Sequence, residues 1–152
     1  MNVSFSTRGW QDKPWETWLD WAETMRFGGI ELYNVQNCPQ LTDRGGALHK
    51  YATAATVRAL REKNIRIPCL DSSCDLTDGQ SAETVRGLIR LAHEIQCPNV
   101  CAVALRDDDA AVHAALRALI PEAEAADVTI LLKTSGIFAD TARLRAVLDD
   151  FA

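Results

Sequence analysis

Five short apolar runs, each followed by an amphipathic stretch of helical period, organise the sequence. The runs begin about 26 to 36 residues apart, which is the length of one β/α unit. Strands and helices that alternate at this spacing predict parallel strands joined by helical crossovers. The expected strands are Val3–Ser6, Gly29–Tyr33, Ile65–Leu70, Asn99–Leu105 and Val128–Leu132.

The amphipathic stretches predict five helices, at about 14–26, 52–63, 82–96, 108–126 and from 141 onward. Pro14 fits the first turn of the first helix, and Gly28 and Gly29 are expected to end that helix. Ser81 is the expected cap of the third helix. Pro121 is expected to kink or interrupt the fourth.

Five β/α units fit either an open doubly wound sheet or part of a closed barrel. Doubly wound nucleotide-binding sheets usually carry a glycine-rich phosphate loop after the first strand. The corresponding segment, 7–12, reads Thr-Arg-Gly-Trp-Gln-Asp, so this fingerprint is absent. The pattern of apolar and polar residues alone leaves both architectures open.

Composition narrows the class of protein. A net charge of −5 gives no electrostatic support for a nucleic-acid-binding surface. No apolar segment approaches the roughly 20 residues that cross a bilayer, and residues 1–7 lack the pattern of a signal peptide. We therefore expect one cytoplasmic domain, residues 1–152, with no membrane and no nucleic-acid partner.

The five cysteines are expected to be buried structural thiols. Their odd number argues against a disulfide framework, and none forms a close C-x-x-C pair. The histidines fall in a loop and on two expected helices, away from the strand ends, so none is a good ligand or base.

Several segments, in the same order along the chain, resemble the xylose-isomerase-like family of sugar phosphate isomerases/epimerases. They are Ser4–Thr7 (SFST), Phe27–Leu32 (FGGIEL), Leu60–Ile65 (LREKNI), Leu91–Ile95 (LAHEI) and Ala123–Val128 (AEAADV). The resemblance covers essentially the whole chain and implies an α/β fold, a partial (β/α)8 TIM barrel of about five β/α units. Family members are closed eight-stranded barrels of about 250 residues or more, so we expect only an amino-terminal portion here.

The resemblance also implies a divalent metal (Mn, Mg, Co or Zn), held by carboxylates and a histidine at the ends of strands five to eight. Strand five of the family commonly ends in a glutamate that binds this metal. In the matching segment, 130–136, that position is Lys133. A protonated lysine repels a cation and has no lone pair, so we expect no metal in this chain.

Glu31 and Lys133 are the candidate catalytic residues. Ile30 and Leu32 alternate with Glu31, so the carboxylate should point into the barrel, where it must be paired or lie near the mouth. Lys133 ends the fifth run, on the face where barrel enzymes keep their chemistry. It could replace the metal's charge and pair with a carboxylate such as Glu31, act as a Schiff-base nucleophile, or be simply exposed.

Four more residues follow strand runs and are candidates for substrate binding: Arg8, Trp10, Asp71 and Arg106. The planar guanidinium groups can grip a phosphate or sugar hydroxyls, and Trp10 can stack on a sugar ring or cover the core. Loop capping and solvent exposure are equally ordinary roles for these residue types. The acidic run 107–109 is explained by the dipole of the helix that follows it.

Three functions remain open. The leading hypothesis is a sugar or sugar-phosphate isomerase/epimerase that is incomplete and lacks the family metal site. The alternatives are a Schiff-base lyase that uses Lys133, and a non-catalytic half-barrel that binds a sugar or a partner. The open edges at 3–6 and 128–132, and the inward Leu131, predict self-association or pairing with a complementary barrel half.

Overall fold

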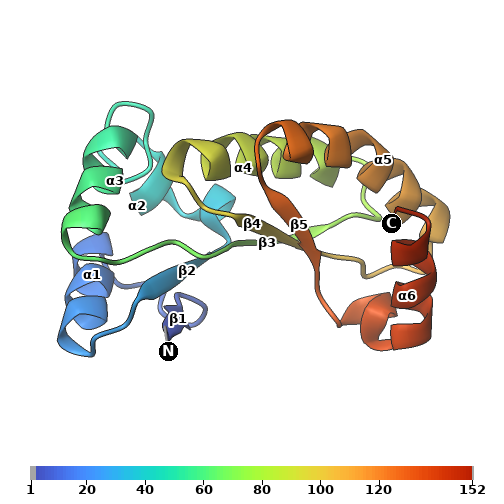
Figure 1. Cartoon of the computed structure of the whole chain (residues 1–152), viewed down its shortest axis with the longest axis horizontal. Coiled ribbons are helices and arrows are strands. Elements are labelled where there is room, and N and C mark those ends of the chain that lie inside the picture. Colours follow the sequence, from blue (N-terminus) through green and yellow to red (C-terminus); the bar gives the residue numbers. More distant parts are fainter. Residues whose placement is uncertain (1–2, 152) are drawn as a thin grey trace.

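The structure is a computed structural model that describes residues 3–151. Five parallel strands form one sheet in the order β1-β2-β3-β4-β5. Their bounds are Ser4–Ser6, Gly29–Tyr33, Leu70–Asp75, Asn99–Val103 and Thr129–Leu132. In a doubly wound sheet the strand order reverses at a switch point, whereas here each strand lies beside its predecessor, as in a barrel. Figure 1 shows this succession from β1 to β5, and it resolves the choice between the two architectures.

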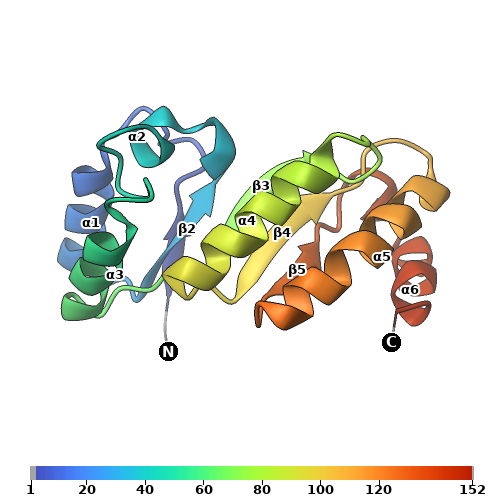
Figure 2. The ribbon, with the colours of Figure 1, turned by 90° about the horizontal axis from the view of Figure 1, so that it is seen from above.

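Helices follow every strand and cover the sheet on its outer side. Figure 2 shows α4 and α5 lying over β3, β4 and β5. The helical segments are α1 (Trp15–Thr24), η1 (Val35–Asn37), α2 (Pro39–Thr42), α3 (Thr53–Glu62), α4 (Ser81–Ile95), α5 (Asp109–Ala125), η2 (Gly136–Ala139) and α6 (Thr141–Asp149). The sequence did not predict η1, α2 and η2, because segments of three or four residues are too short to show a helical period.

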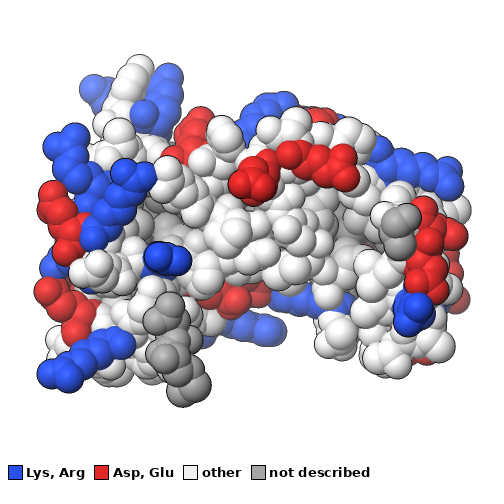
Figure 3. All heavy atoms as spheres, viewed as in Figure 1, with Lys and Arg blue, Asp and Glu red and all other residues white. Residues whose placement is uncertain are grey.

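In β2 and β5, side chains alternate between a more buried outer face and a more open inner face. In β2, Ile30 and Leu32 are completely buried, while Glu31 and Tyr33 are only partly buried. In β5, Leu131 of the inner face is 39% exposed. In the view of Figure 3, charged side chains lie mainly around the periphery, and the surface over β4 and β5 carries few of them.

The third strand begins later than expected. The prediction of 65–70 is wrong, since β3 runs from Leu70 to Asp75. The segment before it does lie along β2, with a single bridge between Gly29 and Arg66. Pro68 has no N–H to donate, so it interrupts the ladder before Leu70. Asp71 is therefore the second residue of β3 and does not follow the strand.

Two expected helix boundaries and one expected interruption also need correction. Ser81 is the first residue of α4, and the cap position is Gln80, which makes no side-chain cap hydrogen bond. Helix α1 ends at Thr24, before the two glycines, and the chain turns at Arg26 with a φ of 57°. Helix α5 runs through Pro121 without interruption.

Tryptophan side chains of α1 pack in and beside the core, and the cysteines have the burial that was expected of them. Trp15 and Trp18 lie in the core, and Trp21 packs at its border against Trp10 with ring centroids 5.4 Å apart. All five cysteines are free thiols; Cys101 is partly buried and the other four are buried. No helix within residues 3–151 is long and apolar enough to cross a membrane.

Candidate functional site

An ion pair joins the third and fifth strands on the inner face of the sheet. Lys133 Nζ lies 2.7 Å from Asp71 Oδ2, and the two side chains are 23% and 7% exposed. The backbone N–H of Lys133 donates to the carbonyl of Ala102, which extends the ladder of β4 and β5 past Leu132. This bond holds the lysine at the carboxyl end of β5, the end where barrel enzymes bind their substrates.

Asp71 is the carboxylate that pairs with Lys133, and the expected direct pair with Glu31 is not found. Within the described residues, Glu31 has no cationic nitrogen within 4.0 Å. The reason lies in strand register. Tyr33 is paired with Asp71, and Asp71 with Cys101, so Glu31 lies two residues nearer the amino end of the sheet. The position of Asp71 opposite Tyr33 can be predicted only when β3 is known to begin at Leu70.

A bulge in β3 shapes the surroundings of Asp71. The register of β3 against β4 shifts between Asp71 and Asp75. Ser72 Oγ donates to the carbonyl of Cys101 at 2.7 Å, while the N–H of Ser73 donates to Asp71 Oδ1 at 3.2 Å. Bulges are common beside active sites, and this one begins immediately after Asp71, the partner of Lys133.

Tyr33 lies between two cationic side chains at the end of β2. Its ring centroid is 5.4 Å from Cζ of Arg8 and 5.6 Å from Nζ of Lys133. Thr7 fixes β1 to this part of β2, because its hydroxyl accepts from the N–H of Tyr33 at 2.9 Å. Arg8, Tyr33, Asp71 and Lys133, from four segments of the chain, thus form one cluster, which we call the inner cluster.

Two candidate residues lie apart from the inner cluster. Trp10 is 49% exposed and packs its ring on Trp21, and its carbonyl accepts from the indole N–H of Trp18. The guanidinium of Arg106 is largely exposed, 3.9 Å from Asp75. Burial raises the pKa of Asp75, but hydrogen bonds from Thr77 and Leu105 outweigh it and hold the pKa below the ordinary value. Substrate contacts of Trp10 and Arg106 remain predictions.

Thiols beside the inner cluster are poor nucleophiles. Burial, with smaller contributions from neighbouring thiols and from Glu31 and Asp71, raises the pKa of Cys69 to about 12. Burial and the Asp71 carboxylate raise the pKa of Cys101 to about 11. A thiol must lose its proton to act as a nucleophile, so these two cysteines are inert near neutral pH.

Metal-ligating side chains do not converge in the part of the chain that the structure describes. Between residues 3 and 151, no three His, Cys, Asp or Glu side chains are grouped so that they could hold an ion. At the inner cluster the Asp71 carboxylate already faces an ammonium at 2.7 Å. The side chains present here therefore do not fit a divalent ion.

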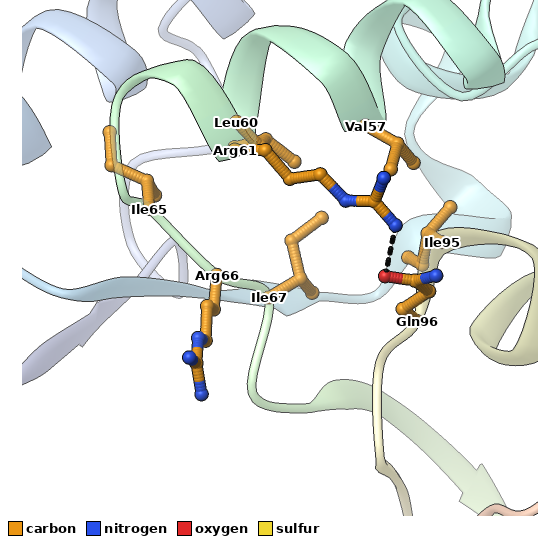
Figure 4. A pocket seen from close by; sticks show the side chains of 8 residues that line it. All are labelled: Val57, Leu60, Arg61, Ile65, Arg66, Ile67, Ile95 and Gln96. Carbon is orange, nitrogen blue, oxygen red and sulfur yellow. Dashed lines mark hydrogen bonds between the residues drawn. The ribbon is translucent and has the colours of Figure 1, made fainter.

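A hollow of about 340 Å³ lies at the opposite end of the strands (Figure 4). Aliphatic side chains from α3, α4 and the segment before β3 line it, with Arg61 reaching across to Gln96 at 2.6 Å. Its residues precede β3 and β4, which places it at the amino ends of the strands. That end of a barrel contributes mainly to stability.

Sequence reasoning missed Tyr33 and Ser73 as members of the site. Tyr33 lies two residues after Glu31 in β2, so the alternation of the strand predicts that both side chains face inward. Nothing in the sequence marks Ser73, because its position depends on the bulge in β3.

Comparison with known proteins gives a match at the level of structure only. No protein-family model matches the sequence, and no curated protein is similar to it. The probable 3-DHS dehydratase AsbF of Bacillus anthracis superposes with a TM-score of 0.76 at 16% identity, over 98% of this chain and 60% of AsbF. A xylose isomerase domain protein of Planctomyces limnophilus gives 0.70 at 9%, over 100% and 58% of the two chains.

The IolI protein, which was solved with a bound zinc atom, gives a TM-score of 0.69 at 16% identity, over 87% of this chain and 51% of IolI. The chain thus spans between half and 60% of the length of these three structures. At these sequence identities the superpositions establish the fold but no activity. The five parallel β/α units of this chain have the fold of a partial xylose isomerase-like TIM barrel.

Proposed function

We propose that this chain is part of a sugar or sugar-phosphate isomerase/epimerase, and that its inner cluster binds an α-hydroxycarbonyl compound. The observation that carries the proposal is the Asp71–Lys133 ion pair at the carboxyl end of the parallel sheet. It places a charged hydrogen-bond donor on the inner face, within 5.6 Å of an aromatic ring. A charged donor beside an aromatic surface is suited to a polar, polyhydroxylated ligand.

The proposed chemistry is a proton transfer next to a carbonyl group. The Glu31 carboxylate takes the proton as the C–H bond breaks, and the electron pair forms the C=C bond of an enediolate. The Lys133 ammonium stabilises the negative charge that develops on the former carbonyl oxygen. Return of the proton to the neighbouring carbon, together with transfer of the remaining hydroxyl proton to the former carbonyl oxygen, isomerises the substrate. Return of the proton to the other face of the same carbon epimerises it.

We propose that this reaction uses the Lys133 ammonium as its cation and requires no divalent metal. A metal ion and an ammonium do the same electrostatic work at a developing oxyanion. The carboxylate of Asp71 balances the charge of the lysine in the resting site. In this ion pair the lysine carries its proton and has no lone pair, which is unfavourable for attack on a carbonyl as a Schiff-base nucleophile.

We also propose that the inner face is covered by association, with a second copy or with further barrel strands. Strands β1 and β5 form the two edges of the described sheet, and Leu131, on the edge strand β5, is 39% exposed. Sedimentation at micromolar concentration tests this. We expect species larger than the monomer, and less of them for Leu131→Glu; a thermally stable monomer would contradict the proposal.

The function is tested by following proton exchange in D₂O. The wild-type chain with D-erythrulose, D-ribulose or their phosphates, in the presence of EDTA, should incorporate deuterium at the carbon next to the carbonyl. Glu31→Gln and Lys133→Met should each lower the rate at least about a hundredfold, as for the loss of a general base or an oxyanion donor. The matched control is Lys13→Met, which removes an exposed lysine paired with Asp12 and should leave the rate unchanged.

Two results of this experiment would contradict the proposal. Exchange that needs added Mn²⁺, Mg²⁺ or Zn²⁺ would show that a metal does the work assigned to Lys133. Covalent trapping of the ketose by borohydride at Lys133 would show a Schiff-base lyase.

A further inference from the structure

Ser73 has an unusual backbone conformation for a residue within a strand. Its φ is 52°, in the left-handed region, and it lies in the bulge of β3. Among the described residues, five other non-glycine residues have positive φ: Arg26, Asn34, Asn64, Gln96 and Asp127. Four of these end helices and Asn34 begins η1, so Ser73 is the member of the group that lies inside a strand.

The left-handed conformation lowers stability at this position. The Cβ of an L-residue comes close to the following carbonyl oxygen, and only glycine avoids this contact. Serine has neither that freedom nor the preference of asparagine for the region. Strained residues of this kind cluster where a side chain must be held in a functional position.

The conformation directs both polar groups of Ser73 to the inner cluster. Its N–H donates to Asp71 Oδ1 at 3.2 Å, and its Oγ lies 3.5 Å from Lys133 Nζ. A separation of 3.5 Å is the outer limit of a hydrogen bond, so the hydroxyl is only weakly engaged. Within residues 3–151 the Ser73 hydroxyl donates to no acceptor.

We infer that Ser73 is a substrate-binding residue, whose hydroxyl and the neighbouring Lys133 ammonium hold two adjacent oxygens of the ligand. The two groups lie 3.5 Å apart on the inner face, so each can contact one oxygen of a hydroxycarbonyl unit. The ammonium binds the oxygen that becomes negatively charged, and the serine binds the neighbouring hydroxyl. The inference rests on the proposed function, since it assumes that the inner cluster binds such a compound.

Three substitutions of Ser73 distinguish the effect of its backbone strain from the effect of its hydroxyl on ligand binding. Ser73→Gly removes the strain and the hydroxyl, Ser73→Ala removes only the hydroxyl, and Ser73→Asn keeps a polar side chain in a residue that tolerates the left-handed region. The matched control is Asn64→Gly, which changes a left-handed residue (φ 55°) after α3, at the amino ends of the strands. Each variant is measured for its Tm and for its Kd for D-erythrulose, an open-chain ketose, by calorimetry.

We expect Ser73→Gly to be more stable than the wild type and yet to bind more weakly. Its Tm should rise by about 1–3 °C, and its Kd should increase about fivefold to tenfold through the lost hydrogen bond. Ser73→Ala should show the same loss of affinity without the rise in Tm, and Ser73→Asn should recover part of the affinity. Asn64→Gly should leave the Kd unchanged.

The outcomes distinguish this inference from the proposed function. If the wild type binds D-erythrulose and Ser73→Gly binds it equally well, the inference is wrong and the proposed function stands. If the wild type and all variants fail to bind any ketose, the proposed function is wrong and the inference falls with it. A lower Tm for Ser73→Gly would overturn the argument from strain whatever the binding result.

Discussion

The segments at the amino ends of the strands and those toward the carboxyl ends use left-handed backbone for different purposes. At the amino ends, Arg26, Asn64, Gln96 and Asp127 each follow a helix by one or two residues. A left-handed residue there ends the helix and turns the chain into the next strand. At the carboxyl ends, the N–H of Asn34 donates to the carbonyl of Asp71 at 2.6 Å, and Ser73, two residues after Asp71, ends no helix.

The side chains at the amino ends of the strands also differ in kind from those at the carboxyl ends. Ile65, Ile67 and Ile95 at the amino ends are at most 5% exposed and pack between α3, α4 and the sheet. At the carboxyl ends, the inner face carries an ion pair and an aromatic ring flanked by two cations. One end is thus built for packing, and the other holds polar groups in place at a cost in stability. Four predictions test this division.

The largest expected effect is at the ion pair. Asp71→Ala removes the anionic partner of the Lys133 ammonium, whose side chain is 23% exposed. It should lower the free energy of unfolding by about 2 kcal/mol, less than the roughly 3–5 kcal/mol lost when a fully buried ion pair is broken. The control Asp12→Ala, in an exposed pair with Lys13, should cost at most about 0.5 kcal/mol. Urea unfolding measures both.

A double-mutant cycle tests the contact between Asp71 and Lys133 directly. Asp71 and Lys133 should show a coupling above about 0.5 kcal/mol, and Glu31 and Lys133 a smaller one, because only the first two are in contact. Strict additivity for Asp71 and Lys133 would contradict the ion pair.

The second prediction concerns packing at the amino ends. Ile67→Val removes one methylene group from a side chain that is 3% exposed and should lower the free energy of unfolding by about 1 kcal/mol. The Kd of the folded protein for D-erythrulose should not change. A weaker Kd would show that the two ends are coupled and that the division is too simple.

The third prediction is a pH dependence at the contact of α5 with α6. His113 Nδ1 lies 2.7 Å from the carbonyl of Asp109, and Nε2 lies 2.8 Å from Asp150 Oδ2. Both ring nitrogens therefore face acceptors, which only the imidazolium can satisfy. The Asp109 carbonyl and the Asp150 carboxylate raise the pKa of His113 above its ordinary value, and they outweigh the opposing effects of desolvation and of Arg117.

Because the folded-state pKa is raised, the contribution to stability is complete below about pH 6.5 and is lost as pH rises through the folded-state value. Asp150 is 61% exposed, so the loss should be only a few tenths of a kcal/mol. The difference in unfolding free energy between the wild type and His113→Gln should shrink between pH 5.5 and pH 8.5. A difference that does not vary with pH would contradict this.

The smallest expected effect is that of added metal. Mn²⁺, Mg²⁺ or Zn²⁺ should not raise the Tm, because an ion stabilises a protein only if it binds the native state. Lys133→Glu should change this little, since it adds one carboxylate where a site needs several ligands. A saturable rise in Tm that EDTA reverses would reveal a metal site.

The sequence predicted the elements of the fold better than their exact ends. The spacing of the apolar runs located four strands to within two residues, and the alternation in β2 placed Glu31 opposite Ile30 and Leu32. The prediction of β3 failed because Ile65, Ile67 and Leu70 read as one apolar strand, although Pro68 breaks its ladder. That error also hid the pairing of Asp71 with Lys133.

The sequence by itself determined the succession of β/α units, the outward aliphatic face of β2, and a lysine at the end of β5. These features depend on periodicity and on local residue type, which are properties of neighbouring residues. The tertiary structure alone decided that Asp71 is the partner of Lys133, that Tyr33 lies between two cations, and that Ser73 takes a left-handed conformation. Each of these depends on the register of strands that are far apart in the chain, and a shift of one residue would turn the side chain to the other face.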